Sequence, residues 1–256
     1  MDYFLVETSS NNSFLMLKKS PPSCAIEVSN VSKMSSIMEK LIGHVPTTTL
    51  TQQFRSNSMI SDWSSHFFYD NKLKAHPSVA RNNLNDLVEI KNDMLEESLI
   101  FLDTSCHQLY EEKDYDGINT GSICNLNEVY IIEIILSKYL NLGIKAEDIG
   151  IITPYWSQVA VLRETFGDIP KLDISTVDGF QGCEKELIII SFVRSNPEKK
   201  VGFLSEIRRI NVTVTRAKRC CFVIGDIETL SSDENIKSFV DFCQRNSVIV
   251  DAEEYI

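Results

Sequence analysis

The second half of the sequence alternates short apolar runs with helical patterns, and this alternation limits the fold more than any other feature. Residues 187–193 are almost uninterruptedly apolar, as expected for a parallel strand that is covered on both faces. Further apolar runs occupy residues 99–102, 149–152, 172–177 and 220–224, and helical patterns occupy residues 125–142, 157–166, 204–217 and 236–244. Strands that alternate with helices predict an α/β fold with a parallel sheet and helices on both faces.

The predicted helix 125–142 has recognisable ends. Asn125 and Glu128 fit a capping box, in which each side chain bonds to the backbone of the other residue, and Gly143 fits the C-cap. Polar residues recur at helical spacing along this segment, at Tyr130, Glu133, Ser137 and Asn141. One face of this helix is therefore expected to be exposed and the remainder buried.

The first 32 residues carry few strand or helix signals, and we interpret them as an irregular remnant of a preceding domain or linker. The main domain is placed at residues 33–230, followed by a C-terminal helix and tail at 231–256. Short helices are predicted at residues 33–41 and 58–69, and the polar, acidic segments 85–97 and 110–122 are predicted to be surface loops.

Composition limits the cellular setting and the partners. Seven scattered cysteines without a C-x-x-C pair suit reduced thiols in a cytoplasmic or nuclear protein, so no metal site is expected. The sequence shows neither a signal peptide nor an apolar run of membrane-spanning length, so no membrane partner is expected. A net charge of −11 predicts weak binding to nucleic acid overall, although a local groove can still be basic.

Three polar segments follow predicted strands, where ligands bind in open α/β sheets. They are 153–155, 178–182 and 194–196. Three such polar segments on one edge of the sheet indicate a binding site. Any single one of them is explained equally well by the need to end a strand in a polar turn.

The predicted helix 204–217 separates two kinds of side chain. Its core stripe is expected to contain Phe203, Ile207, Ile210, Val214 and Ala217. Arg209, Thr213 and Arg216 recur on another face, and an arginine side chain suits phosphate oxygens. The alternative interpretation is a solvated basic face.

Four motifs occur in order along the second half of the chain: Gly150–Tyr155, Ser175–Glu186, Ser191–Asn196 and Gly202–Ala217. Together they resemble superfamily 1B helicases, most closely the immunoglobulin mu-binding-protein and up-frameshift types. Upstream, Leu50–Arg55 resembles the family's Q-Y-R motif and His76–Arg81 matches the mu-binding type. The resemblance implies a C-terminal RecA-like domain, the second of two domains that enclose ATP.

The resemblance also implies roles for individual residues around ATP. Arg55 and Arg216 match the two arginines that contact the γ-phosphate, a contribution worth roughly 10³ to 10⁵ in rate in related enzymes. The ATP-binding positions match Gln53, Phe54, Gly182, Glu184 and Arg209. Phe54 replaces the usual tyrosine and keeps the ring that stacking requires.

On the edge that binds single-stranded DNA or RNA, the family positions match Thr153, Pro154, Tyr155, Thr176 and Asp178. Hydroxyls and backbone amides there suit phosphates, as sequence-independent binding requires. For Asp178, the alternative is that it caps its own turn. The family unwinds with 5′ to 3′ polarity, and the present residues do not distinguish DNA from RNA.

The sequence contains no G-x-x-x-x-G-K-[ST] and no early acidic pair that would hold magnesium. The resemblance implies that ATP and Mg²⁺ are held mainly by an N-terminal RecA-like domain, which is therefore an expected partner. Two interpretations remain open: part of an ATP-driven helicase, with negligible hydrolysis by this chain alone, or a degenerate helicase domain that binds nucleic acid or protein without catalysis. A third, a purely structural α/β domain, would leave the arginines solvated.

Overall fold

The computed structural model describes residues 3–8, 11–18, 48–113 and 122–255, with the backbone alone at residues 3–18. A six-stranded parallel sheet forms its centre, in the order β12-β5-β11-β10-β8-β9. Its strands are β5 (Leu99–Asp103), β8 (Ile149–Thr153), β9 (Asp173–Thr176), β10 (Lys185–Ser191), β11 (Ala217–Gly225) and β12 (Val248–Asp251). The parallel α/β fold expected from the sequence is confirmed.

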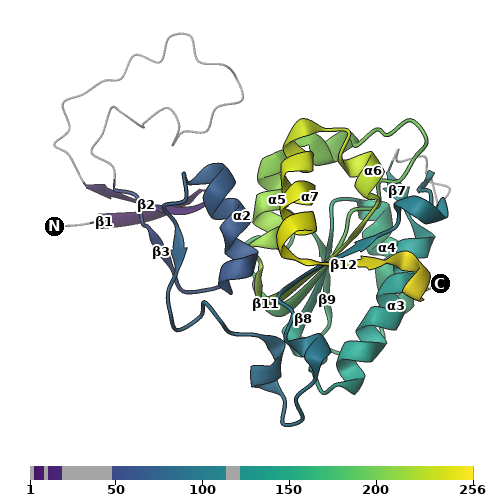
Figure 1. Cartoon of the computed structure of the whole chain (residues 1–256), viewed down its shortest axis with the longest axis horizontal. Coiled ribbons are helices and arrows are strands. Elements are labelled where there is room, and N and C mark those ends of the chain that lie inside the picture. Colours follow the sequence, from purple (N-terminus) through teal and green to yellow (C-terminus); the bar gives the residue numbers. More distant parts are fainter. Residues whose placement is uncertain (1–2, 9–10, 19–47, 114–121, 256) are drawn as a thin grey trace.

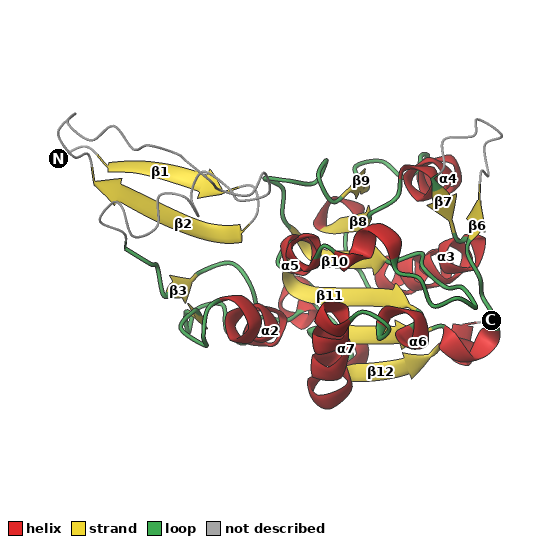
Figure 2. Cartoon of the chain, turned by 90° about the horizontal axis from the view of Figure 1, so that it is seen from above, coloured by secondary structure: helices red, strands yellow, loops and turns green. Residues whose placement is uncertain are grey.

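Helices cover both faces of this sheet (Figures 1 and 2). On one face lie α3 (Leu126–Asn141) and α4 (Trp156–Phe166), and on the other α2 (Ser58–Phe68), α5 (Ile207–Val214) and α7 (Glu234–Asn246), with the short α6 (Ile227–Leu230) next to α7. Successive residues of β10 divide between two hydrophobic cores, because strand side chains alternate: Leu187 and Ile189 pack into one, Ile188 and Ile190 into the other. The apolar run is thus buried on both sides, as expected.

Smaller elements surround the sheet. Two short pairs join β3 (Gln52–Gln53) to β4 (Lys74–Ala75) and β6 (Glu112–Lys113) to β7 (Ile123–Cys124). Single turns of 3-10 helix occur at Leu84–Leu87, Asp93–Leu95, Ser105–His107, Ala146–Asp148, Gly202–Ser205 and Ala252–Tyr255. The segment expected to be a loop at 85–97 contains two of them.

Two expectations about the chain ends change. Tyr3–Thr8 (β1) and Asn11–Lys18 (β2) form an antiparallel pair, so the prediction of an irregular start is wrong there. The polar residues 9–13 lie between two apolar runs, which is the pattern of a hairpin and was overlooked. The C-terminal segment supplies β12, an edge strand of the main sheet, in addition to the expected helix. The expected helix 33–41 and residues 114–121 lie outside the described residues.

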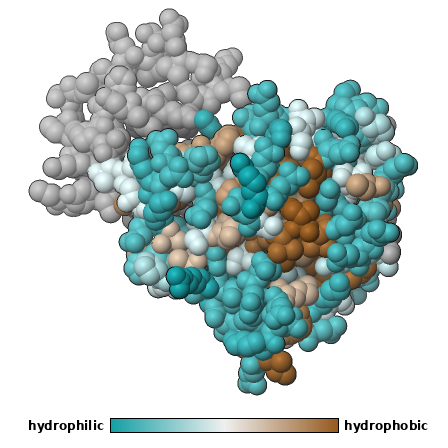
Figure 3. Space-filling view, viewed as in Figure 1, coloured by the Kyte–Doolittle hydropathy of each residue, from teal (hydrophilic) through white to brown (hydrophobic). Residues whose placement is uncertain are grey.

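The surface is mainly hydrophilic on the face shown in Figure 3, with a hydrophobic patch in the region of β12. β12 exposes Val248 and Ile249, at 37% and 40%. Among the described residues, no helix has the length and apolar character that a membrane span requires.

The predicted helix 204–217 is the largest error within the sheet region. The α-helix covers only Ile207–Val214; a 3-10 turn precedes it at Gly202–Ser205, and β11 begins at Ala217. Phe203 therefore lies outside the core and is 71% exposed, while Ile210, Val214 and Ala217 are buried as expected. A helical spacing count cannot detect this change of geometry at both ends of the segment.

Candidate nucleotide and nucleic-acid sites

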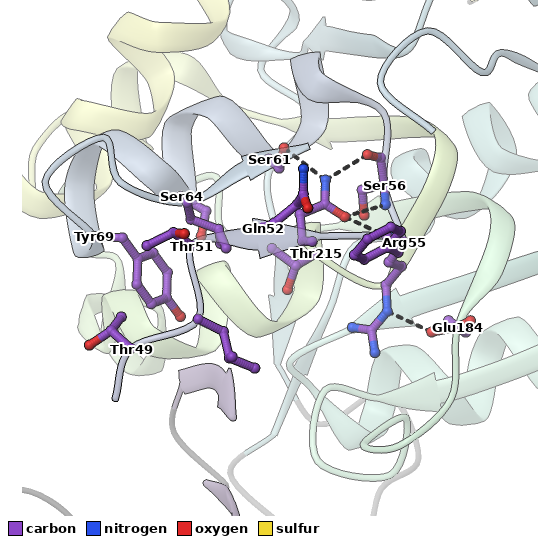
Figure 4. A pocket seen from close by; sticks show the side chains of 14 residues that line it. Thr49, Thr51, Gln52, Arg55, Ser56, Ser61, Ser64, Tyr69, Glu184 and Thr215 are labelled. Carbon is purple, nitrogen blue, oxygen red and sulfur yellow. Dashed lines mark hydrogen bonds and ion pairs between the residues drawn. The ribbon is translucent and has the colours of Figure 1, made fainter. Parts of the chain in front are cut away.

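A cavity of about 720 Å³ lies between the segment 49–56, helix α2 and the loop that follows β9. It is lined by Thr49, Leu50, Thr51, Gln52, Gln53, Phe54, Arg55, Ser56, Ser61, Ser64, Tyr69, Leu73, Glu184 and Thr215 (Figure 4). The structure thus brings four of the residues predicted around ATP to one cavity: Gln53, Phe54, Arg55 and Glu184.

The side chain of Gln53 shapes the loop that carries Arg55. Its amide nitrogen donates to the Ser56 carbonyl at 2.7 Å and to the Ser61 hydroxyl at 3.3 Å. Its amide oxygen accepts from the backbone N–H groups of Arg55 at 2.7 Å and Ser56 at 2.9 Å. Because both ends of the amide are used within the loop, Gln53 holds the backbone at Arg55 in place.

Phe54 presents an aromatic ring at the cavity. Its side chain is 63% exposed, and its ring stacks on His76 with centroids 4.3 Å apart and planes inclined by 25°. A ring supported in this way can still stack against a planar ligand on its exposed side.

Arg55 and Glu184 form an ion pair, with Arg55 Nε 2.6 Å from Glu184 Oε2. Figure 4 shows the two side chains pointing toward each other beside the cavity. Lys218 also lies 3.3 Å from the other carboxylate oxygen of Glu184. One carboxylate therefore faces two cations, and an anion entering the cavity would compete with Glu184 for Arg55.

Arg216 lies beyond the end of α5 and is 97% buried (3% exposed). Its guanidinium donates to the Val212 carbonyl at 3.2 Å and to the Cys183 carbonyl at 3.4 Å. Arg55 contacts Glu184 and Arg216 contacts Cys183, so both predicted arginines reach the same short loop. Gly182, in that loop, has φ +85°, a conformation that glycine adopts without strain.

Arg209 does not join this cavity. It lies 3.1 Å from Glu206 and 3.6 Å from Asp178. A second cavity, of about 290 Å³, includes these three residues in its lining together with Val177, Gln181, Arg208 and Val212. The expectation that Arg209 and Arg216 project from one helix face is wrong, because Arg216 follows the end of α5 and is buried.

The carboxyl ends of β8, β9 and β10 lie side by side in the sheet. The predicted strand-binding hydroxyls are used locally: Thr153 Oγ1 accepts from the Tyr155 N–H at 3.5 Å, and Thr176 Oγ1 accepts from the Gly179 N–H at 3.2 Å. Thr153 and Tyr155 are buried, Pro154 is partly buried, and the Asp178 side chain is 73% exposed. This edge therefore offers Pro154 and Asp178 to a ligand more directly than its threonines.

Sequence reasoning missed the buried acid behind this edge. Glu128 accepts from the Ser191 hydroxyl at 2.5 Å and from the Val193 N–H at 3.1 Å, and does not close the expected capping box. Burial raises the pKa of Glu128 to about 8, with smaller increases from nearby Asp226 and Glu111, although its hydrogen bonds oppose the shift. Asn125 caps α3 as expected, through the N–H groups of Asn127 and Glu128.

The backbone held by Glu128 is unusual. Val193 has φ +69°, a strained value for a β-branched residue, and is completely buried. Its N–H is held by Glu128 and its carbonyl accepts from the Asn125 side chain at 3.2 Å. The next residue, Arg194, lies 3.3 Å from the buried carboxylate of Glu111. Both bonds to Val193 fix the turn that leads β10 into residues 194–196.

Comparisons with known proteins agree with this architecture. A protein-family model described as an AAA domain (AAA_12) matches residues 30–228. DNA-binding protein SMUBP-2 of Rattus norvegicus is 38% identical over 246 residues, which cover 93% of this chain and 24% of that protein. DNA polymerase alpha-associated DNA helicase A of Schizosaccharomyces pombe is 36% identical over 226 residues, which cover 85% of this chain and 34% of that protein.

Among solved structures, one described as the C-terminal domain of a possible DNA helicase from Lactobacillus aligns at 10% identity with a TM-score of 0.38, over 68% of this chain and 88% of that one. The chain spans about a quarter of the length of the SMUBP-2 relatives that it matches. With the family model covering most of the sequence, the chain belongs to the AAA_12 family, and it is similar to a DNA-binding protein and to a DNA helicase.

Proposed function

We propose that this chain forms the arginine-donating side of an ATP cleft in a helicase motor and binds single-stranded nucleic acid along the carboxyl edge of its sheet. The observation that supports this most directly is that Arg55 pairs with Glu184 and Arg216 donates to the adjacent Cys183, with Arg55 and Glu184 in the lining of the 720 Å³ cavity. Arginine forks suit the charge that develops on a transferred phosphoryl group.

The cavity suits a nucleotide in size and lining. Its volume lies within the roughly 300–1,000 Å³ usual for small-molecule sites. The supported ring of Phe54 can stack on a base, and the loop held by Gln53 presents Arg55 to the phosphates. Glu184 is paired with Arg55, and a phosphate that displaced it would leave the Glu184 carboxylate with Lys218.

The remaining parts of an ATP site would come from another domain. The sequence contains no P-loop pattern, so the lysine and the Mg²⁺ ligands are assigned to an N-terminal RecA-like domain. Bound Mg²⁺ would neutralise charge on the β- and γ-phosphates. We therefore expect negligible ATP hydrolysis by this chain alone, and a γ-phosphate role for Arg55 and Arg216 in the assembled motor.

The nucleic-acid partner is assigned to the edge beyond β8 and β9. One relative is a DNA-binding protein by name and another is a DNA helicase, which supports a single-stranded nucleic acid as the ligand. We assign 5′ to 3′ polarity and a nuclear or cytoplasmic setting by the same likeness. Both DNA and RNA remain candidates.

Nucleotide binding tests the first half of the proposal. Titration calorimetry of the chain with ATP should detect weak binding, and Arg55→Ala should reduce the affinity roughly tenfold or more, because a charged hydrogen bond is lost. The matched control is Arg219→Ala, which removes an arginine paired with Glu186 at 2.7 Å, outside the cavity lining. Equal affinity in wild type and Arg55→Ala would contradict the assignment.

Phosphate release tests the division of labour between the two domains. The purified chain with single-stranded DNA or RNA should release phosphate no faster than buffer containing ATP. Turnover at the rate of ordinary motors, abolished by Arg216→Ala, would show a complete active site and refute our proposal.

The absence of a P-loop pattern favours a second candidate, a binding module without catalysis. In that case the chain binds single strands, and Arg55→Ala and Arg216→Ala in the longest available form of the protein change neither ATP affinity nor turnover. A loss of turnover in either variant would exclude this candidate.

A further inference from the structure

Two large aromatic side chains lie exposed at the carboxyl edge of the sheet. Trp156, the first residue of α4, is 67% exposed, and Phe203, in the 3-10 turn before α5, is 71% exposed. Each ring offers a flat aromatic face on which a planar group can stack.

Tyr155 connects these two side chains. It directly precedes Trp156, and its own ring is buried, with its centroid 6.3 Å from that of Phe203. Gly202 lies close against the same residues: a Cβ there would come within 3.2 Å of Arg194 Nη1 and 3.5 Å of the Tyr155 hydroxyl. The turn carrying Phe203 is therefore packed onto the strand-binding residues predicted from the sequence.

Several polar groups of this edge already have partners within the protein, so aromatic side chains can add to its binding of a strand. Thr153 and Thr176 use their hydroxyls within the protein. Arg194 is partly buried and paired with Glu111, so its charge is largely compensated. Phosphate contacts depend on cations, so the compensated charge of Arg194 makes stacking on bases a useful further source of binding energy at this edge.

We propose that Trp156 and Phe203 form a stacking surface for the unpaired bases of a single-stranded nucleic acid. This inference rests on the proposed strand-binding function and adds the chemical group that is recognised. Every base has a flat aromatic face, so the surface accepts any sequence. It excludes intact duplex, whose bases are stacked on one another.

Two oligonucleotides of equal length separate base stacking from phosphate contact. One is fluorescein-labelled oligothymidylate, and the other is its abasic counterpart, which keeps the sugars and phosphates. Anisotropy titrations at low salt should show wild-type protein binding the oligothymidylate at least about tenfold more tightly than the abasic strand.

Variants then assign this preference to the two rings. Trp156→Ala and Phe203→Ala should each weaken binding of oligothymidylate about tenfold and leave binding of the abasic strand unchanged. Trp156→Phe should retain most of the preference, since it keeps a ring. The control is Ile90→Ala, which removes an 85% exposed apolar side chain from the segment preceding β5.

The outcomes distinguish the two levels of the proposal. Equal binding of both strands by wild-type protein would overturn the stacking surface and leave the strand-binding function intact. If the preference for oligothymidylate persists when Trp156 and Phe203 are both replaced with alanine, the stacking surface is also overturned, and other residues must contact the bases. If neither strand binds, the proposed function fails and the stacking surface with it.

Tryptophan fluorescence gives a second, direct readout. The chain contains two tryptophans, and Trp63 is buried while Trp156 is exposed. Oligothymidylate should quench the exposed component, and the abasic strand should not. In Trp156→Phe the quenching should disappear although binding persists. Quenching that persists in this variant would show that Trp63 is the reporter and would count against contact with Trp156.

Discussion

Replacing Glu128 with glutamine changes the charge of one buried side chain and hardly alters its shape. In the folded protein, burial raises the pKa of Glu128 to about 8, against an ordinary value of 4.5. The folded state therefore holds this proton more tightly than the unfolded state does. The stabilisation is complete below pH 4.5, is lost as the pH rises from 4.5 to 8, and stays lost above that value.

The difference between these two pKa values corresponds to roughly 5 kcal/mol of unfolding free energy. Glutamine has no proton to lose, so Glu128→Gln should lack this pH dependence. Urea unfolding followed by tryptophan fluorescence between pH 5 and 9 measures it. The free energy of unfolding of the wild type, minus that of the variant, should fall by several kcal/mol across this range. Other titrating groups are common to both proteins, so their contributions largely cancel in this difference.

Glu133→Gln is the matched control, since Glu133 lies on the exposed face of the same helix. Its difference from wild type should remain nearly flat with pH. Parallel pH curves for wild type and Glu128→Gln would show that Glu128 titrates like a surface carboxyl. That result would refute the description of a buried acid holding the turn at Val193.

Two further changes test neighbouring parts of the structure. Asn125→Ala removes both the cap of α3 and the contact with the Val193 carbonyl, and should lower the free energy of unfolding by about 1–3 kcal/mol in urea titrations, whereas Asn127→Ala should cost little. In Gly182→Ala the added Cβ meets no atom within 4 Å, but alanine must adopt φ +85°, so the change should cost only about 1 kcal/mol of stability. Calorimetry should show weaker ATP binding by this variant, and unchanged ATP affinity would separate this turn from the nucleotide site.

The sheet was predictable because its signals are local. The apolar run at 187–193 and the helix that starts after Asn125 each follow from a few adjacent residues, and both were found within two residues of their ends. The pairing of β1 with β2 does not follow from the sequence analysis, since the apolar runs are short and the polar residues between them also suit an irregular loop.

Side-chain partners distant in sequence were less predictable. Glu128 looked like part of a capping box three residues from Asn125, yet it contacts Ser191, 63 residues away. The spacing of Arg216 predicts that it extends a helical face. The helix ends at Val214, however, and the guanidinium of Arg216 donates to the Cys183 carbonyl. In both cases the pairing depends on which strands become neighbours, and periodicity within one segment contains no information on that.

The loop after β9 connects the two candidate sites. Asp178 lies near Arg209 at the second cavity. Five and six residues later, Cys183 accepts from Arg216 and Glu184 pairs with Arg55 at the first cavity. Phe180, between them, is buried in the core, so the two ends of the loop are tied to one anchored ring. Displacement of Glu184 by a nucleotide would therefore act on a segment whose other end borders the strand-binding edge. A change at one end of this loop could reach the other only if both ends shifted together.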